Sequence, residues 1–284
     1  MKLNKKIVTA VLCAVAAVSI LATAGCGSDK DDNVLKVGME CGYAPYNWSQ
    51  TTNENNAVKI AGTSEYASGY DVMMAQKIAD DMGKKLEIHK IDWNGLAPAV
   101  KSGKIDAVLA GMSITSKRKA SVDFSLPYYY ASVVTMTTKD SKYAKAKGLS
   151  DLKGAKVTSQ MNTIWYTKMV DQIPEVEKLP AISTVPGMVV ALTSGKVDAL
   201  VADLPAAMAA QASNPKIVIL DFTGQKDNYE FNNEDVEIGA AIKKGNKELA
   251  DAINKTLKNM TQEDFNKIMQ KAIETQPMAE NKDI

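Results

Sequence analysis

The chain has 284 residues, a formal net charge of +1 and 24% charged residues. This nearly neutral composition excludes the strongly basic surface of a nucleic-acid-binding protein. One histidine and three cysteines, without zinc-site spacing and without nucleotide-binding or hydrolase motifs, favour a protein that has no metal, no cofactor and no catalytic activity.

The first 25 residues have the pattern of a secretory signal peptide. Three lysines precede an apolar segment over 7–24, small residues lead to Cys26, and a polar run follows. A retained transmembrane anchor is the alternative, because about eighteen apolar residues can just span a bilayer. The small residues before Cys26 favour cleavage, and loss of the three lysines would lower the formal charge from +1 to −2.

Strands and helices alternate after this leader. The patterns predict a strand over 34–39, a helix over 71–82 with one apolar face, and a strand over 86–91. Residues 49–69 are polar and rich in Asn and Thr, which indicates a surface insertion or a hairpin. This alternation is typical of an α/β fold.

A duplicated segment follows. Residues 95–110 (GLAPAVKSGKIDAVLA) return as 187–202 (GMVVALTSGKVDALVA), with eight of sixteen positions identical. Each copy reads as an apolar-periodic helix, a Ser-Gly-Lys stop and a buried strand. A repeat of this kind indicates two lobes of similar architecture.

The rest of the chain predicts a second lobe that is entered and left once. We expect the first crossing near Ser132, after residues 122–130, and the return crossing over 235–242. The first lobe would then hold residues 34–132 and 235–275, and the second lobe 133–234. Further expected elements are strands over 155–159 and 217–220, helices over 163–173, 247–260 and 265–273 with Thr261 as N-cap, and a loose tail over 276–284.

The two copies of the repeat continue into residues of opposite charge. The first runs through Gly111, Met112 and Ser113 to Arg118, and the second ends at Asp203. Ligands in open α/β sheets bind beyond the carboxyl ends of the strands. Two such ends facing each other would hold a zwitterion between a cation and an anion.

Structural explanations for these residues stay open. Arg118 lies in a Ser/Lys/Arg-rich stretch typical of a solvated surface. Asp203 precedes Pro205, as an N-cap often does, and Ser113 could cap a helix that starts at Ser116.

Several runs resemble the amino-acid-binding lipoproteins of ABC importers, solute-binding protein family 3. They cover 35–48, 68–83, 92–129, 149–157 and 194–203, and the pattern GMSIT-x-x-R followed by VDFS-x-PYY is the most specific. The resemblance implies an α/β fold of two Rossmann-like lobes joined by two hinge strands, the type II periplasmic binding protein or Venus flytrap fold. Such a monomer closes on one free amino acid and delivers it to an ABC permease and its ATPase.

The same resemblance implies a membrane anchor. Ala-Gly-Cys at 24–26 resembles the bacterial lipobox, although Thr23 stands where that motif usually has Leu. A lipid on Cys26 would tether the protein to the outer face of the cytoplasmic membrane, outside the cytoplasm. Cys41 would then have no disulfide partner.

The family pattern also implies ligand contacts. Arg118 would bind the α-carboxylate with two parallel hydrogen bonds, and Asp203 would bind the α-ammonium from the other lobe. Ser113 and the backbone of Gly111 and Met112 would assist. Further implied contacts are Asn162 and Thr163 at a helix start, Tyr43 and Trp93 flanking the ligand side chain, Glu40 at its polar or cationic end, and Tyr46.

Departures from the family pattern leave the ligand open. Met161 precedes Asn162 where the family commonly has Gly, and the 49–69 segment is longer than usual. We expect a polar or cationic amino acid before a small neutral one. The alternatives are a dehydratase-like enzyme, with Glu40 as its candidate acid, and a ligand-sensing signalling ectodomain.

Overall fold

The computed structural model describes residues 33–277. The signal peptide, the alternative transmembrane anchor, Cys26 and residues 278–284 lie outside the described residues. None of the helices within 33–277 combines the length and apolarity needed to cross a bilayer. Cys41 is a free, buried thiol.

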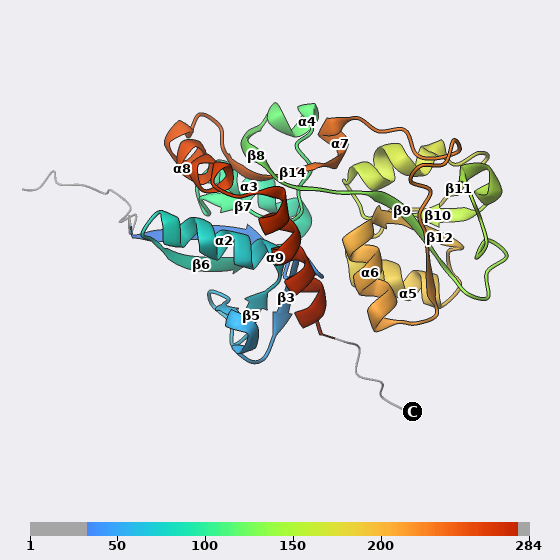
Figure 1. The fold of residues 1–284 in the computed structure, drawn as a ribbon, viewed down its shortest axis with the longest axis horizontal. Coiled ribbons are helices and arrows are strands. Elements are labelled where there is room, and N and C mark those ends of the chain that lie inside the picture. The colour runs from blue at the N-terminus through green and yellow to red at the C-terminus, as the bar shows by residue number, and fades with distance from the viewer. Residues whose placement is uncertain (1–32, 278–284) are drawn as a thin grey trace, which may run out of the picture. The chain divides into compact units, whose positions relative to one another are not determined.

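The first sheet has the strand order β6-β1-β7-β14-β8. Strand β1 pairs in parallel with β6 and β7, whereas β14 runs antiparallel to β7 and β8. We call this sheet, with its helices and the small four-stranded sheet described below, which contacts β6, lobe 1 (Figure 1). Its elements are β1 (Val34–Met39), β6 (Lys85–Lys90), β7 (Ala107–Val108), β8 (Val122–Tyr130), β14 (Glu237–Lys243), α2 (Tyr70–Asp81), α3 (Trp93–Ser102), α4 (Ser116–Lys119) and α8 (Lys247–Lys258).

The second sheet repeats this arrangement with the order β11-β10-β12-β9-β13. Its central strands β10 and β12 are parallel, and β9 runs antiparallel to β12 and β13. We call this sheet, with its helices, lobe 2. Its elements are β9 (Val133–Thr138), β10 (Lys156–Thr158), β11 (Glu177–Lys178), β12 (Ala199–Asp203), β13 (Ile217–Leu220), α5 (Val185–Thr193) and α6 (Leu204–Ser213).

The predicted repeat therefore has a structural counterpart. Helix α3 leads into β7 and helix α5 leads into β12, and each strand lies third in its sheet. Gly103 and Gly195 follow the two helices with positive φ, as expected for the Ser-Gly-Lys stop. The duplication predicted from the sequence is a duplicated helix–strand unit.

The polar segment predicted as an insertion or hairpin forms the hairpin. Strands β2 (Gly42–Tyr43), β3 (Asn47–Gln50), β4 (Val58–Lys59) and β5 (Tyr66–Ser68) make a four-stranded sheet in the order β2-β3-β5-β4. Asn55 and Asn56, in the connection between β3 and β4, have positive φ, a conformation that Asn tolerates better than most residues.

The chain passes between the sheets close to the predicted positions. Strand β8 ends at Tyr130 and β9 begins at Val133, on either side of Ser132. The return crossing over 235–242 stays a prediction; in this stretch α7 (Asn233–Val236) is one helical turn and β14 begins at Glu237. The side chains of Asn232 and Asp235 form a capping box, which favours a helix start over a strand.

Two other predictions need correction, one for a helix and one for the C-terminal tail. Residues 163–173 contain a π-helix over Trp165–Met169 followed by a 3-10 turn over Val170–Gln172. At the start of this segment the Thr163 carbonyl accepts from both the amide and the hydroxyl of Thr167. The tail prediction was wrong for Gln276, which is 6% exposed directly after α9.

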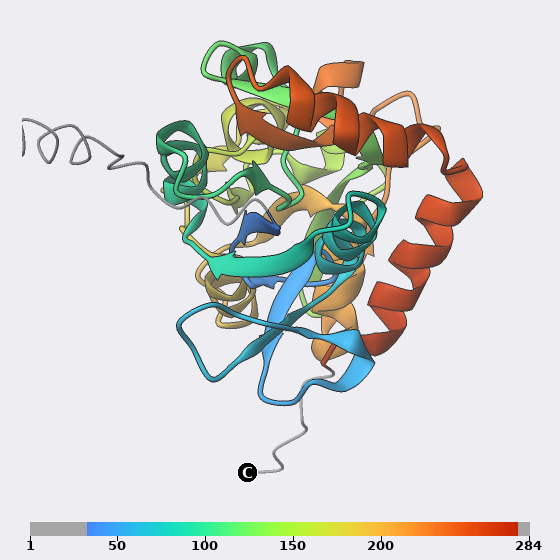
Figure 2. The same cartoon turned by 90° about the vertical axis from the view of Figure 1, so that its left-hand side faces the viewer.

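Helices α8 and α9 end the described chain. Thr261 caps α9 (Gln262–Thr275) through a capping box with Asp264, as the sequence predicts. Helix α9 contacts α2 of lobe 1 and α6 of lobe 2. Figure 2 shows α8 and α9 as consecutive helices at an angle to each other.

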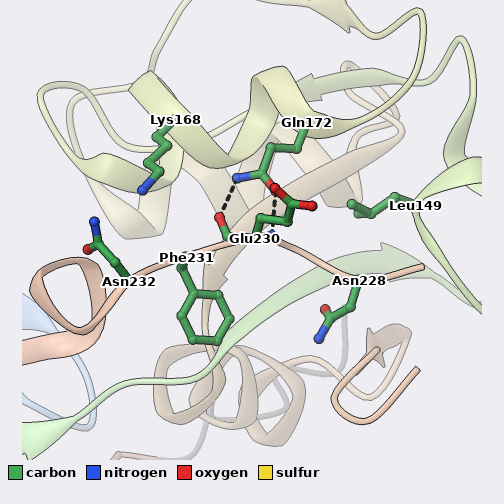
Figure 3. Close-up of a pocket in the computed structure, with 7 residues that line it drawn as sticks. All are labelled: Leu149, Lys168, Gln172, Asn228, Glu230, Phe231 and Asn232. Carbon is green, nitrogen blue, oxygen red and sulfur yellow. Dashed lines mark hydrogen bonds between the residues drawn. The ribbon is translucent and has the colours of Figure 1, made fainter. Parts of the chain in front are cut away.

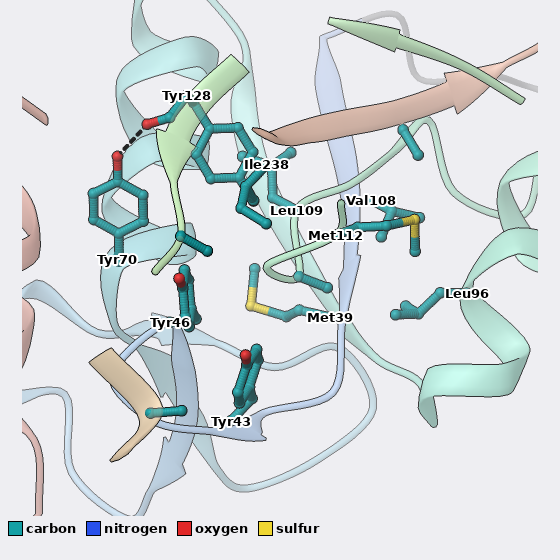
Figure 4. Close-up of a cluster of buried hydrophobic side chains, with 14 of the residues drawn as sticks. Met39, Tyr43, Tyr46, Tyr70, Leu96, Val108, Leu109, Met112, Tyr128 and Ile238 are labelled. Carbon is teal, nitrogen blue, oxygen red and sulfur yellow. Dashed lines mark hydrogen bonds between the residues drawn. The ribbon is translucent and has the colours of Figure 1, made fainter. Parts of the chain in front are cut away.

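The core behind the strand ends of lobe 1 is aromatic. Tyr46 stacks on Tyr43 with ring centroids 4.9 Å apart and meets Tyr70 and Tyr129 edge to face. The Tyr70 hydroxyl donates to the Tyr128 carbonyl (Figure 4). Each aromatic pair of this kind adds roughly 1 kcal/mol beyond burial. The cluster therefore gives the residues in front of it a rigid backing.

Candidate functional site

The candidate site lies where parallel strands of both sheets end. Glu40 follows β1, Gly111 follows β7 after a short connection, Gln160 follows β10, and Asp203 ends β12. A small hollow at this place is lined by residues of both lobes. They are Tyr43, Trp93, Gly111, Ser113, Arg118, Gln160, Thr163 and Trp165.

Arg118 reaches this hollow from the short helix α4. Thr115 is the N-cap of α4 and accepts from the Arg118 amide, which excludes the alternative that Ser113 caps this helix. The Arg118 Nη1 donates to the Ser113 carbonyl at 2.8 Å, and Nη2 donates to the Asn162 carbonyl at 3.3 Å.

The charge of Arg118 has no carboxylate partner among residues 33–277. Its guanidinium lies over the Trp93 ring, 5.1 Å from the centroid. Burial lowers the pKa of Arg118 to about 10, which marks a cation that has lost solvation without gaining an anion. A planar carboxylate is the group that suits this guanidinium.

Asp203 is the buried acid of lobe 2. It is 1% exposed and caps α6, with Oδ1 accepting from the Ala206 amide at 3.0 Å. The N-cap role considered from the sequence is therefore confirmed. Its other oxygen accepts from the Tyr43 hydroxyl of lobe 1. Burial raises the pKa of Asp203, because no cation in the described part of the chain pairs with it.

Glu40 presents a half-satisfied carboxylate at the end of β1. Its Oε1 accepts from Gln160 Nε2 at 3.0 Å, whereas Oε2 is buried without a hydrogen-bond partner. Burial, which outweighs the Gln160 bond, raises the pKa of Glu40 to about 7, and the nearby charges of Asp92 and Asp71 add to the shift. The free oxygen can accept from a cationic or polar group.

Gln160 was not predicted from the sequence. It is 4% exposed, lines the hollow and donates to Glu40 across the lobes. Its position directly after a predicted parallel strand was the available signal, since site residues gather at such ends. Trp165, which also lines the hollow, lies in the irregular helix and carried no comparable signal.

Tyr43 and Trp93 line the hollow from lobe 1, as the sequence predicts. Tyr46 lies behind Tyr43 in the aromatic core and is 1% exposed, with a buried hydroxyl that has no hydrogen-bond partner. Gly111 has φ +59°, and a Cβ there would lie 2.8 Å from the Tyr43 ring. Only glycine fits this approach without displacing Tyr43.

Of the remaining predicted residues, Thr163 lines the hollow, whereas Asn162 and Met112 line a neighbouring hollow that shares Trp93 and Arg118 with it. Asn162 has φ +58°, and its Nδ2 donates to Asn94 Oδ1 of α3 at 2.7 Å. Thr163 lines the hollow and donates to the Gln160 carbonyl at 2.7 Å. Met112 is buried, and its carbonyl accepts from the Gly239 amide of β14 at 3.1 Å.

A larger hollow of about 710 Å³ lies elsewhere in the molecule (Figure 3). Gln172 and the backbone of Glu230 pair through two hydrogen bonds of 2.7 and 2.6 Å there. Lys168 pairs with Asp235. The Glu230 carboxylate has no ion pair but is exposed, so the lining of this hollow has no buried unpaired charge to offer a ligand.

The smaller site combines one unpaired cation with several acids. Arg118 is the cation. Asp203 and Glu40 do not line the hollow themselves, but each accepts from a residue that does, Tyr43 and Gln160 respectively, and Asp71 is buried nearby. Acids held close together without cations have raised pKa values and favour any positive charge that enters. The arrangement suits an amino acid, particularly one with a positively charged side chain.

Comparisons with known proteins agree with this arrangement. The family model of the bacterial extracellular solute-binding proteins, family 3, matches residues 35–275. A probable histidine-binding protein of Campylobacter jejuni is 30% identical over 75% of this chain and 80% of its own length. The arginine-binding extracellular protein ArtP of Bacillus subtilis is 29% identical over 87% of this chain and 89% of its own length.

Solved structures give the same result. An ancestral arginine-binding protein bound to arginine has a TM-score of 0.66 and 32% identity, and the match covers 84% of this chain and 97% of that one. The ancestral amino-acid-binding protein AncCDT-1, a precursor of cyclohexadienyl dehydratase, has a TM-score of 0.69 and 29% identity over 86% and 96% of the two chains. The two-lobed α/β fold predicted from the sequence is confirmed, and the chain belongs to the bacterial extracellular solute-binding proteins of family 3.

Proposed function

We propose that this protein binds a free L-amino acid outside the cell and delivers it to an ABC importer. The observation that carries the proposal is the buried Arg118 guanidinium, which has no carboxylate partner within 33–277 and lies in one hollow with residues of both lobes. A carboxylate that enters would supply the missing anion. Asp203, in the other lobe, would bind the α-ammonium.

The other polar groups would complete the contacts to the α-carboxylate and the α-ammonium of the ligand. Ser113 and the backbone of Gly111 and Met112 lie on the same side as Arg118, and Asn162 and Thr163 approach from lobe 2. The Tyr43 hydroxyl holds Asp203. A bound α-ammonium would compete with this hydroxyl and give Asp203 a charged partner in place of a neutral one.

The side-chain subsite favours a cationic or polar ligand. The buried Glu40 Oε2 has no partner, and Tyr43 and Trp93 supply flat surfaces nearby. A guanidinium or imidazolium would satisfy this oxygen and lie against an aromatic face. The relatives named for arginine and histidine agree with this preference.

The lobes would close around the ligand as two bodies, residues 34–132 with 235–275 and residues 133–234. Because the carboxylate and ammonium contacts come from different lobes, the ligand binds the closed arrangement better and thereby favours it. A monomer held at the outer face of the cytoplasmic membrane by a lipid on Cys26 would pass the amino acid to a permease and its ATPase.

Calorimetry with the twenty standard amino acids tests the proposal. We expect heat of binding with L-arginine or L-histidine, and loss of that heat in Arg118→Ala while the circular dichroism spectrum is unchanged. An absence of heat with every amino acid, from a protein that is folded by the same spectrum, would contradict the proposal.

Catalysis on the same scaffold is a second candidate function. Two observations favour it: the Glu40 carboxyl, whose pKa of about 7 suits proton transfer, and the similarity to a dehydratase precursor. Product formation from arogenate, abolished by Glu40→Gln, would support this alternative. Binding of an amino acid without turnover would favour transport.

A further inference from the structure

A buried carboxylate lies directly behind the site without lining it. Asp71, in the first turn of α2, is 0% exposed. Its Oδ2 accepts from Asn47 Nδ2 at 2.8 Å, and its Oδ1 accepts from the Tyr128 hydroxyl at 2.7 Å. These two neutral donors come from β3 and β8, so the carboxylate ties α2 to two other elements of lobe 1.

The same carboxylate connects to both site-forming turns of lobe 1. Asn47, while donating to Asp71, accepts from the Cys41 amide at 2.8 Å through its Oδ1. Cys41 follows Glu40 directly and has φ +55°, a strained conformation for a non-glycine residue that surrounding contacts must maintain. A hydrogen bond from the Gly111 amide to Asp71 lowers the pKa of this carboxyl and so opposes the effect of burial. One carboxylate thus reaches the turn that carries Glu40 and the turn that carries Gly111.

This carboxylate is a costly way to fill the space. Burial raises the pKa of Asp71 to about 7, and no Lys or Arg pairs with it among the described residues. Apolar residues can replace a buried polar group at equal or better stability when packing is the sole requirement. A carboxylate offers what they cannot, because several donors can be held at fixed angles around its two oxygens.

We propose that Asp71 is a positioning residue for amino-acid binding. It touches no ligand. Through Asn47 it fixes the turn that carries Glu40, and it accepts directly from the Gly111 amide, while the Tyr128 hydroxyl holds the carboxylate in place. This inference rests on the proposed function, since the two positioned groups are the ones assigned to the ligand side chain and the ligand carboxylate.

A matched pair of tyrosine variants tests it. Tyr128→Phe removes a donor to Asp71, whereas Tyr70→Phe removes the neighbouring buried hydroxyl that donates to the Tyr128 carbonyl. We expect Tyr128→Phe to weaken calorimetric binding of L-arginine and L-histidine at least fivefold, and Tyr70→Phe to leave it within twofold of wild type. Equal losses in both variants would show that general stability is responsible and would overturn the proposal.

Exchanging the two partners provides a rescue. Asp71→Asn alone places an amide donor against other donors, and we expect a loss of affinity of at least tenfold. Adding Asn47→Asp reverses the hydrogen bond between the two positions: the new carboxylate at position 47 accepts from the Cys41 amide and from the new amide at position 71. Affinity should then return to within threefold of wild type. A folded double variant that does not recover would overturn the proposal, and if neither variant folds, the tyrosine pair decides.

A measurement without ligand separates this inference from the proposed function. In ¹H–¹⁵N spectra, Tyr128→Phe should shift the Cys41 amide resonance, although that amide does not contact Tyr128, and Tyr70→Phe should leave it in place. Unchanged Cys41 resonances in both variants would overturn the positioning role. If wild-type protein bound neither amino acid, the proposed ligand would be wrong, and the spectra would still decide the role of Asp71.

Discussion

The acid at the end of β1 should make binding depend on pH. Glu40 has a pKa raised to about 7 by burial, with Asp92 and Asp71 nearby and no facing cation within 33–277. A cationic ligand side chain stabilises the ionised form and lowers this pKa, so binding releases a proton near neutral pH. Affinity for L-arginine should therefore rise as the pH rises through 7, by about tenfold between pH 5.5 and pH 8.

Calorimetry at these two pH values measures the effect. Glu40→Gln keeps the Gln160 contact within reach but cannot ionise at this position, so its weaker binding should depend on pH less than that of wild type. L-Arginine that binds wild type equally at both values would remove Glu40 from the ligand contacts.

Arg118 should have opposite effects on binding and on stability. Its charge is desolvated without an anion in the described part of the chain, which costs folding free energy when no ligand is present. Arg118→Met removes the charge and keeps an unbranched chain against Trp93. We expect binding to be lost while the free energy of unfolding stays level or rises by about 1 kcal/mol.

Urea unfolding of both proteins without amino acid, together with calorimetry, checks this prediction. Arg118→Lys is the matched control, because it retains charge but loses the planar fork. A large fall in stability for Arg118→Met would indicate that the guanidinium has mainly a structural role.

At the level of elements, the sequence predicted regular structure better than its exceptions. The repeat over 95–110 and 187–202 became α3–β7 and α5–β12, because apolar periodicity reports which face a segment buries. Helix α7 and the π-helix at Trp165–Met169 were missed as such. Helix α7 begins at a side-chain capping box of Asn232 and Asp235, which apolar periodicity does not register.

For the candidate site too, sequence patterns indicated some residues and missed others. Arg118 and Asp203 could be singled out as candidates because they follow the two copies of one repeat. Gln160 could not, because its importance comes from a contact with Glu40, which lies 120 positions away in the sequence. Contacts between lobes depend on tertiary packing, which local patterns do not contain.

Helix α9 offers a test of predicted capping. Thr261 accepts from the Asp264 amide, and the Asp264 carboxylate accepts from the Thr261 amide, so two unpaired donors at the helix start are satisfied. Thr261→Ala should lower the free energy of unfolding by about 1 kcal/mol, whereas Thr261→Ser should cost a few tenths. Chemical denaturation measures both, and equal stability of the two variants would contradict the capping role.

At the level of the whole molecule, polar contacts join the lobes around the site. Tyr43 donates to Asp203, and Gln160 donates to Glu40. At the mouth, Asn162 donates to Asn94. The first two contacts involve residues assigned to the ligand. Asn94 lines the neighbouring hollow and, unlike Asn162, is assigned no ligand contact, so altering Asn94 tests closure without removing a proposed contact.

Removing this pair should shorten the lifetime of the bound state. The hydrogen bond between Asn94 and Asn162 forms only when the lobes meet, and a net bond of this kind contributes about 1 kcal/mol. Asn94→Ala should therefore raise the dissociation rate of L-arginine roughly fivefold and leave the association rate nearly unchanged, because the open lobes still present the same contacts.

Stopped-flow tryptophan fluorescence measures both rates, since Trp93 and Trp165 line the site. Asn214→Ala, which removes a local bond to the Lys216 amide within lobe 2, is the matched control. If both variants release the ligand at the wild-type rate, the Asn94–Asn162 pair does not contribute to closure.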